Sequence, residues 1–438
     1  MKNYLKNSII YQVFVRNYTK EGTFKALEKH LDDISKLKVD ILYLLPINEI
    51  GIINRKGDLG SPYSIKDYYK INPELGDIDS FKHLINETHK RNMKIMIDIV
   101  FNHTSRDSWI LNNHPEWMYH NDKGEFANKA GDWSDVYDLD TSNPELIKYL
   151  VDVIDYYSSL GIDGYRFDVA SLISSKFYKE LKLMLDKKYP NTILLGESTH
   201  SSFIKYCRDN NFNSLSDEEL YSLGFDLLYN YNSIEALQNY ILNQDITSLI
   251  EYKVETNLEN ISNNKNALRI RGLENHDQIR IINYNKLNSS FYKTLLAFPA
   301  FLKGPLFIYN GLESKSNHKL DLFTKDLLSK EIDNDWYNYL LKIINFKKES
   351  SNLKLLTCTP LIDNKSSLII KNIYEDKKES YGLFNFSSND ELEITFLKDN
   401  YNHYFIEDGT YIDYLSNKEI LIKDHKILVK EPLFLFKK

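Results

Sequence analysis

The chain has 438 residues, which is long for one compact domain unless that domain is a large barrel with an appendage. Hydrophobic residues make up 42% and charged residues 27%, the balance of a soluble globular protein, and the formal net charge of −7 argues against nucleic acid as a partner. The two cysteines, Cys207 and Cys358, are far apart and lack metal-ligand spacing, so a disulfide framework is not expected.

Membrane and export signals are absent from the sequence. No segment approaches the ~18 consecutive apolar residues that span a bilayer. The first 15 residues contain neither a long apolar stretch nor a small-residue cleavage site. The sequence therefore predicts a cytoplasmic protein without a membrane partner, and it leaves the oligomeric state open.

Short β-branched runs alternate with segments of helical period from the N-terminus to about residue 350. The helical segments cover 23–38, 79–92, 143–161 and 175–189. The segment 143–161 begins with "NPE", an N-cap signal. The candidate strands are 9–15, 39–45, 94–100, 163–167, 192–197, 224–228, 269–275 and 305–310. Eight such repeats predict an α/β fold of the (β/α)8 TIM-barrel type, whose active site lies at the C-terminal ends of the strands.

Two segments depart from a plain barrel. Residues 102–142, after the third strand, show little helical period, and a loop of that length is usually functional or a small subdomain. Beyond about residue 350, short alternating runs with turn signals predict an antiparallel β domain. We therefore expect a catalytic barrel over 1–350, a loop subdomain over 102–142 inserted after strand 3, and a C-terminal β-sandwich domain over 351–438.

Charged and polar residues follow four of the predicted strands. One such carboxylate is more often a helix N-cap than a catalyst. Four strands of a barrel, however, deliver their terminal residues to one mouth, which favours a shared site. These residues are Asp98, Asn102 and His103 after strand 3; Arg166 and Asp168 at strand 4; Glu197 after strand 5; and Asn275, His276 and Asp277 after strand 7.

Several carboxylates beside an arginine and imidazoles suit the cleavage of a glycosidic bond. That reaction uses one carboxylate as nucleophile and one protonated carboxylic acid to protonate the leaving oxygen. Arg166 and Asp168 are two residues apart and share a side of their strand, so we expect the arginine to lower the pKa of Asp168. Glu197 follows the apolar run "ILLG", where we expect its pKa to be raised.

The motifs "DIVFNH", "GYRFDVAS", "GES" and "ENHD" resemble, in order, the four short conserved regions of the α-amylase family, glycoside hydrolase family 13. Residues 60–77 resemble the family's segment in the second barrel loop, and "VYDLD" (136–140) resembles its short region in the loop subdomain. The resemblance covers residues 9 to about 310, and the β tail corresponds to the family's C-terminal domain.

The resemblance implies roles for the charged residues. It implies Asp168 as nucleophile, Glu197 as general acid/base and Asp277 as the carboxylate that stabilises the transition state. It implies that Arg166 orients and ionises Asp168. In this arrangement the two reacting carboxyl groups of a retaining enzyme lie about 5–5.5 Å apart.

The resemblance also implies the residues that hold the sugar. Tyr63 would stack on the ring at the cleavage site, and His103 and His276 would hydrogen-bond its hydroxyls. Asp98 lies between apolar residues, and we interpret it as structural support of the site.

The implied function is a retaining hydrolase of α-glucosidic bonds, with α-1,4 bonds of maltooligosaccharides or starch-derived glucans as the expected substrate. The chemistry requires no cofactor. A transglycosylase or phosphorylase, resembling 4-α-glucanotransferases or sucrose phosphorylases, would use the same covalent intermediate, and an α-1,6-glucosidase is a further alternative. A non-catalytic carbohydrate-binding protein on the same barrel is disfavoured because Asp168, Glu197 and Asp277 are all present.

Two positions depart from many relatives. Ser171 and Leu172 stand where those relatives carry Lys-His, a pair that contributes to substrate contact and to a calcium site. Asn102 matches the family's first calcium ligand, with Asp132 and Asp135 as further acidic candidates. Ca²⁺ needs about six to eight oxygen ligands, so a structural Ca²⁺ at Asn102 stays open.

Three of the four tryptophans lie in the loop subdomain. They are Trp109, Trp117 and Trp133. Tryptophan serves either as a sugar platform or as the core of a loop, and we expect at least two of these to form the core.

Overall fold

Eight parallel strands form the centre of the computed structural model, which describes residues 2–131, 133–260, 267–284, 289–329, 331–350, 355–361, 366–374, 376–387, 391–396, 398 and 405–438. The strand order is β11-β10-β9-β8-β5-β2-β1-β12. Their bounds are β1 Ile9–Val13, β2 Ile41–Leu44, β5 Lys94–Ile99, β8 Gly164–Phe167, β9 Ile193–Gly196, β10 Leu227–Leu228, β11 Leu268–Arg269 and β12 Leu306–Tyr309. Each lies within or overlaps its predicted range, so the predicted TIM barrel is confirmed.

The barrel closes between its seventh and eighth strands. Arg271 and Leu306 form a parallel bridge, in which the Arg271 N–H donates to the Pro305 carbonyl at 2.8 Å and the Arg271 carbonyl accepts from the Phe307 N–H at 2.8 Å. The seventh strand was expected over 269–275, but it ends at Arg269. The turn that follows is held by an ion pair of Glu274 with Arg280 at 2.8 Å.

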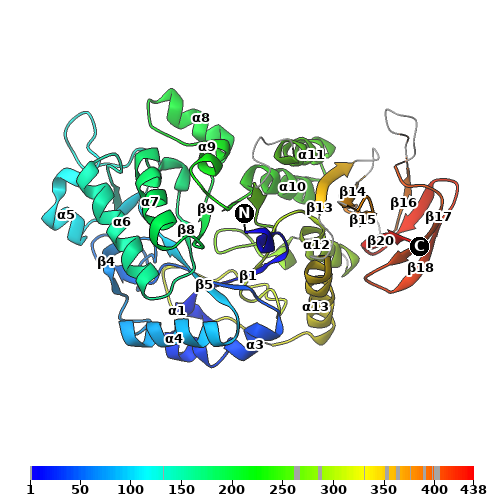
Figure 1. Ribbon diagram of the computed structural model, residues 1–438, viewed down its shortest axis with the longest axis horizontal. Helices are drawn as coiled ribbons and strands as arrows, with labels where there is room; N and C mark the ends of the chain where they lie inside the picture. Colours follow the sequence, from blue (N-terminus) through cyan, green and yellow to red (C-terminus); the bar gives the residue numbers. More distant parts are fainter. Residues whose placement is uncertain are drawn as a thin grey trace.

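Helices surround the barrel (Figure 1). The segment 23–38, predicted as one helix, is two helices, and the break lies at His30, whose ring packs edge-on against Tyr18. Asn143 caps its helix ahead of Pro144, as "NPE" predicts. The α-helices are α1 Val15–Tyr18, α2 Phe24–Glu28, α3 Leu31–Lys36, α4 Ile78–Lys90, α5 Trp109–Asn113, α6 Pro144–Ser159, α7 Ser175–Lys188, α8 Ser201–Asp209, α9 Asp217–Ser222, α10 Tyr231–Asn243, α11 Ile246–Asn260, α12 Ser289–Phe301 and α13 Asn334–Glu349. Within the described ranges, none of these helices has the length and apolarity to cross a membrane.

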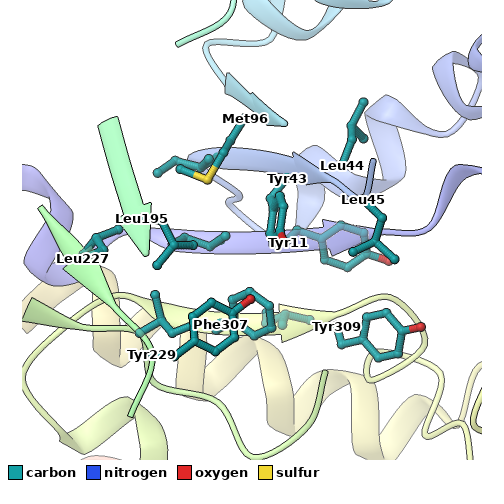
Figure 2. Packing of buried hydrophobic residues seen from close by; sticks show 14 of the residues in the cluster. Tyr11, Tyr43, Leu44, Leu45, Met96, Leu195, Leu227, Tyr229, Phe307 and Tyr309 are labelled. Atoms are coloured by element: carbon teal, nitrogen blue, oxygen red, sulfur yellow. The ribbon is translucent and has the colours of Figure 1, made fainter. Parts of the chain in front are cut away.

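Large apolar side chains fill the barrel below its mouth. Figure 2 shows Tyr43, Leu195 and Phe307, from three different strands, gathered with their neighbours between the strands. The rings of Tyr43 and Tyr229 each lie 6.3 Å from the ring of Phe307. Burying such side chains removes apolar surface from water and makes the strand ends a rigid platform for the site.

Two short hairpins flank the mouth. One pairs β3 Asn48–Ile50 with β4 Ile65–Ile71. The other pairs β6 His103–Ser105 with β7 Val136–Asp138, so that the two ends of the 102–142 segment run side by side. This pairing holds His103 directly beside the barrel.

The C-terminal part is an antiparallel β domain, as predicted, and lies at one end of the molecule's long axis (Figure 1). Its six-stranded sheet has the order β13-β14-β15-β20-β17-β18, and β16 pairs with β19. Phe434 packs against Phe301 of α12 and Phe346 of α13, with ring centroids 4.9 and 4.4 Å apart. The strands are β13 Leu355–Leu361, β14 Ser367–Tyr374, β15 Glu379–Asn385, β16 Leu392–Thr395, β17 Gly409–Asp413, β18 Lys418–Ile422, β19 Lys426–Val429 and β20 Leu433–Lys437. The exact domain boundaries stay predictions, and the Cys358 side chain lies outside the described residues.

Candidate active site

Arg166 is the centre of the polar cluster at the barrel mouth. It lies on β8 beside Asp98 of β5, and Asp168 and Glu197 are the first residues after β8 and β9. Arg166 Nη1 donates to Asp98 Oδ1 at 2.8 Å and to Asp168 Oδ1 at 2.7 Å, while Nη2 lies 3.0 Å from Glu197 Oε2. One guanidinium group therefore joins three carboxyl groups from three adjacent strands.

The cluster holds more negative than positive charge in a buried place. Arg166 and Asp98 are almost completely buried, and Asp168 is 6% exposed. Burial raises the pKa of Asp168 well above its usual value; Arg166 lowers that pKa, and the charges of Glu197 and Asp98 raise it further. Arg166 thus acts in the expected direction, but the expected low pKa of Asp168 is wrong because burial, together with the charges of Glu197 and Asp98, outweighs the effect of the arginine.

The two predicted histidines line the same pocket as neutral groups. Burial lowers the pKa of His103 to about 4 and that of His276 to about 4, so both rings are uncharged at neutral pH. His103 Nε2 lies 3.9 Å from Asp168 Oδ2, and His276 Nε2 lies 3.1 Å from Asp277 Oδ2. Neutral imidazoles here can donate or accept hydrogen bonds with a polyhydroxylated ligand without adding charge.

Tyr63 and Asp277 complete the predicted set. The Tyr63 hydroxyl donates to Asp98 Oδ2 at 3.0 Å and lies 2.6 Å from His276 Nε2, which fixes the phenol in the pocket wall. The Asp277 side chain is 47% exposed at the pocket rim. Six of the eight predicted residues line one pocket, and the other two, Asp98 and Arg166, are buried and hydrogen-bonded to residues of its lining.

Sequence reasoning missed three residues that hold the cluster. Tyr231, at the start of α10, donates to Glu197 Oε1 at 3.1 Å, and the Tyr43 hydroxyl donates to Asp98 Oδ2 at 2.7 Å. Gln12 Nε2 lies 3.2 Å from His276 Nδ1. A polar atom within an apolar strand, at residues 12 and 43, is the signal that identifies two of them. Tyr231 follows the sixth strand, and residues 229–234 contain no charged side chain that would mark a site there.

Val169, directly after Asp168, has a strained backbone. Its φ of 43° lies in the left-handed region, which a β-branched residue rarely adopts. The Val169 N–H donates to Glu197 Oε2 at 2.9 Å. Backbone strain of this kind costs about 1–3 kcal/mol and is found mainly at functional sites. Here it turns the chain so that the backbone after Asp168 binds the neighbouring carboxylate.

The pocket above the cluster has a volume of about 270 Å³. Asp168, Glu197, Tyr63 and both histidines line it, together with Trp133 of the 102–142 segment. Of the other two tryptophans of that segment, Trp117 is 5% exposed, whereas Trp109 is 39% exposed and stacks on Tyr149 at 5.4 Å. The expectation that at least two of the three form a local core therefore holds for Trp117 alone.

Ser171 and Leu172 lie beneath this part of the mouth. Ser171 is completely buried, and its hydroxyl accepts from the Thr199 N–H at 3.3 Å. Leu172 packs in a small apolar cluster with Val169 and Cys207. These positions serve packing in this chain, so they supply no polar group to the pocket.

A calcium ion beside Asn102 was left open by the sequence. Asn102 Oδ1 is buried and has no hydrogen-bond partner among the described residues, which leaves one oxygen for a cation. Nδ2 of the same residue donates to Asp138 Oδ1 at 3.1 Å. The second oxygen of Asp138 accepts from the Lys129 N–H at 2.8 Å, and the Lys129 ammonium donates to the Leu139 carbonyl at 2.9 Å.

These groups do not fit Ca²⁺. The ion needs about six to eight oxygen ligands, and the Lys129 ammonium already binds the neighbouring carbonyl and would repel a divalent cation. Asp135 pairs with Lys56 at 3.1 Å, and Asp132 lies outside the described residues. Across the described ranges, no group of three or more His, Cys, Asp or Glu residues is arranged to hold a metal ion.

Comparison with known proteins gives a family match. Residues 9–113 and 108–390 match the family model described as "Alpha amylase, catalytic domain". The intracellular maltogenic amylase of Bacillus subtilis is 27% identical over 429 residues, which cover 92% of this chain and 65% of that protein. This chain therefore spans about 65% of the length of that curated relative.

Two solved structures are similar over almost their whole length. The α-amylase from Lactobacillus plantarum has a TM-score of 0.89 and 33% identity, and 99% of each chain is covered. A noncanonic maltogenic α-amylase from Thermotoga neapolitana has a TM-score of 0.85 and 26% identity, with the same coverage.

Proposed function

Because the chain belongs to the α-amylase family of glycoside hydrolases, we propose that it hydrolyses α-1,4-glucosidic bonds in maltooligosaccharides or starch-derived glucans. The names of its relatives support this substrate class: they include a maltogenic amylase, an α-amylase and a cyclomaltodextrinase. The residues at the barrel mouth support the reaction.

The observation that carries the proposal is the shared arginine. Arg166 contacts both Asp168 and Glu197, so the two carboxyl groups face one another across a single guanidinium group. An inverting enzyme needs about 6.5–9.5 Å between its carboxyl groups to admit a water molecule, whereas a retaining enzyme brings them closer. The shared contact favours the retaining mechanism.

In the proposed mechanism, Asp168 attacks the anomeric carbon while Glu197 donates a proton to the departing glycosidic oxygen. The C–O bond to the leaving sugar breaks as the bond to Asp168 Oδ forms, giving a glycosyl-enzyme of inverted configuration. Glu197, now ionised, takes a proton from water, which attacks the anomeric carbon, releases Asp168 and restores the α configuration.

The net negative charge of the cluster favours the binding of one proton, which the cleavage step uses and the hydrolysis step restores. With three carboxyl groups around one arginine, a proton held by one of them relieves the repulsion among the rest. The proposed mechanism uses Glu197 as the proton donor and Asp168 as the attacking carboxylate, and Arg166 favours this division because its charge lowers the pKa of Asp168 against the opposing effect of burial. Tyr231 orients Glu197 through its 3.1 Å hydrogen bond. Asp277 at the rim is positioned to stabilise the positive charge that develops on the sugar ring.

Neutral groups would hold the sugar. His103, His276 and Tyr63 surround the place above Asp168, and we assign the two imidazoles to hydroxyl groups of the sugar and the Tyr63 ring to its apolar face. The chemistry uses these side chains alone and requires no cofactor. We further propose that Lys129 supplies the positive charge that Ca²⁺ would supply near Asn102.

A cytoplasmic location is part of the proposal, supported by the name of the Bacillus subtilis relative, an intracellular maltogenic amylase.

Product analysis tests the function. The purified chain is incubated with maltotriose to maltoheptaose, soluble starch, isomaltose and sucrose, with and without inorganic phosphate. We expect shorter maltooligosaccharides from the α-1,4 substrates, independent of phosphate. Longer products from maltotriose would indicate transglycosylation, phosphate-dependent sugar phosphates would indicate a phosphorylase, and cleavage of isomaltose alone would indicate an α-1,6-glucosidase. No turnover of any α-glucoside would overturn the proposal.

A further inference from the structure

Three loops meet at one side of the catalytic pocket. They are residues 51–61, which lie between β3 and β4 in the segment after barrel strand β2, residues 133–135, which precede β7, and the described residues 312–329, which follow β12. Lys56 Nζ lies 3.1 Å from Asp135 Oδ1 and 5.8 Å from the centre of the Phe323 ring. All three of these side chains line the pocket, so Lys56 links the loops across its edge.

Hydrogen bonds hold two of these three loops, which together are called the barrier, in contact with one another. Arg16, which is 3% exposed, donates from Nη1 to the Gly60 carbonyl at 2.9 Å and to the Leu322 carbonyl at 3.0 Å. The Leu59 N–H donates to the Phe323 carbonyl at 2.9 Å. The two longer loops are therefore tied to one another and to Arg16 of the short helix α1, which follows β1.

A glycine permits the close contact between these loops. Gly57 has a φ of 60°, and a Cβ atom at this position would lie 2.7 Å from the Cβ of Phe323. A side chain there would push the 51–61 loop away from Phe323. The close approach is thus specified by the residues of both loops.

The barrier lies across the barrel from Glu197. In the closed strand order, β9, which carries Glu197, is opposite β1, and the loops after β2 and β12 lie on either side of β1. Glu197 protonates the leaving oxygen, so the leaving part of the substrate extends over the β9 side. The sugar that is transferred to Asp168, and whatever precedes it toward the non-reducing end, extends the other way, toward Lys56.

We propose that Lys56, held by Asp135 and Phe323, closes the pocket on the non-reducing side, so that the enzyme removes short units from chain ends rather than cutting within chains. The pocket volume of about 270 Å³ lies just below the range of about 300–1,000 Å³ for small-molecule sites, which suits a short terminal unit. The Lys56 ammonium, 36% exposed, is free to donate to the terminal hydroxyls of that unit. This inference rests on the proposed hydrolysis of α-glucans, and it specifies that the glucan is cut near its non-reducing end.

A substrate with a blocked end tests the barrier. Maltoheptaose labelled at its reducing end with 2-aminopyridine is compared with the same compound carrying a 4,6-O-ethylidene group at its non-reducing end. For the unmodified chain we expect one main labelled product at early times and cleavage of the capped substrate at least about tenfold slower than that of the uncapped one. Lys56→Ala is expected to raise the capped-to-uncapped rate ratio by about tenfold and to give a ladder of labelled products.

A matched lysine provides the control. Lys66 lies on β4, pairs with Glu49 at 3.4 Å and is 32% exposed, and it does not line the pocket. Lys66→Ala is expected to leave the rate ratio unchanged. Phe323→Ala, which opens the same barrier from the other side, is expected to raise the ratio, so the proposal stays testable if Lys56→Ala does not fold.

The outcomes separate this inference from the proposed function. If the unmodified chain cleaves maltoheptaose but gives a ladder and accepts the capped substrate equally well, the barrier is refuted and the hydrolase stands. If Lys56→Ala and Phe323→Ala both fold and leave the ratio unchanged, the assignment to Lys56 is refuted. If neither substrate is cleaved by the unmodified chain, the proposed function itself fails.

Discussion

Two arginines, Arg166 and Arg280, are almost completely buried, yet their surroundings differ in kind. Arg280 has one carboxylate partner, Glu274 at 2.8 Å, and its remaining donors bind the His318 and Asn310 carbonyls at 2.9 Å each. Arg166 has three carboxyl partners, and two of them line the pocket.

The difference separates a structural ion pair from a reactive one. At Arg280 each buried charge is balanced, and Glu274 also accepts the Ile281 N–H at 2.7 Å, so the network fixes the turn that follows the seventh strand. At Arg166 the excess of carboxylates is unfavourable for the folded state, and such crowding is found where ionisable groups must exchange protons. Burial alone therefore does not identify a catalytic arginine; the charge balance around it does.

The largest expected effect is the loss of the nucleophile. Asp168→Asn keeps the shape of the side chain but removes its charge, so activity on maltotriose is expected to fall roughly 10⁴- to 10⁶-fold. Steady-state kinetics measures this loss. Thermal unfolding is the control: the midpoint should not decrease, since one charge leaves a crowded cluster. Activity within tenfold of the unmodified chain would remove Asp168 from the mechanism.

Glu197→Gln tests the protonation of the leaving group separately from the attack by Asp168. Without the acid, cleavage of maltotriose should fall about 10²- to 10⁴-fold. The loss should be much smaller for the first step on 4-nitrophenyl α-maltoside, because 4-nitrophenol leaves without protonation, and a burst of nitrophenol reports that step. An equal loss on both substrates would mean that Glu197 does not act as the acid.

Glu274→Gln tests the structural ion pair between Arg280 and Glu274. It leaves the Arg280 charge buried without its partner, which is expected to lower the free energy of unfolding by about 3–5 kcal/mol. Activity per folded molecule should stay the same, because Glu274 does not line the catalytic pocket. Urea denaturation and active-site titration check the two parts. Asp186→Asn, which breaks an exposed pair with Lys182, is the control and should cost under about 0.5 kcal/mol.

The crowded cluster should also make stability depend on pH. The pKa of His276 is about 4 in the folded chain and about 6.5 in an unfolded one, so the unfolded state binds more protons between these values. The stabilising contribution of the neutral ring is complete above pH 6.5 and is lost as the pH falls toward 4.

Comparison with the variant His276→Asn isolates the loss of stability that is due to His276. The cost of His276→Asn to the free energy of unfolding should shrink by on the order of 2–3 kcal/mol between pH 7 and pH 4.5. Asp138, whose pKa is raised to about 6, acts in the opposite sense, but it contributes equally to both proteins and cancels in the difference. A cost that is the same at both pH values would contradict the low pKa of His276.

The smallest expected effect is that of metal removal. Since the Lys129 ammonium binds the Leu139 carbonyl, a chelator such as EDTA should change the midpoint of thermal unfolding by less than about 1 °C, and added Ca²⁺ should not raise it. Lys129→Ala should lower the midpoint, because Asp138 loses its nearby positive charge. A rise of several degrees with Ca²⁺ in the unmodified chain would refute this assignment.

Strand-end residues made most of the site predictable from the sequence. Asp98, Arg166, Asp168 and Glu197 each end or follow an apolar strand, and in a barrel such positions must converge. The prediction required only the strand boundaries and the identity of the charged residues. The same rule does not find Tyr231, because no charged residue directly follows the sixth strand.

Charge sharing and loop contacts were not predictable in this way. The sequence places Arg166 beside Asp168, but whether it also reaches Glu197 depends on the register of β8 and β9. Lys56 and Phe323 are 267 positions apart and meet only because their loops follow neighbouring parts of the mouth. The net rise in the pKa of Asp168, which comes chiefly from its burial, and the contact between these two loops both depend on long-range packing.

The stereochemistry of the first product tests the central claim most directly. Proton NMR follows the hydrolysis of maltotriose at high enzyme concentration, before mutarotation mixes the anomers. A double displacement through Asp168 predicts that the newly formed reducing end appears first as the α anomer and then equilibrates. A first product in the β configuration would show a single displacement by water and would contradict a covalent intermediate on Asp168.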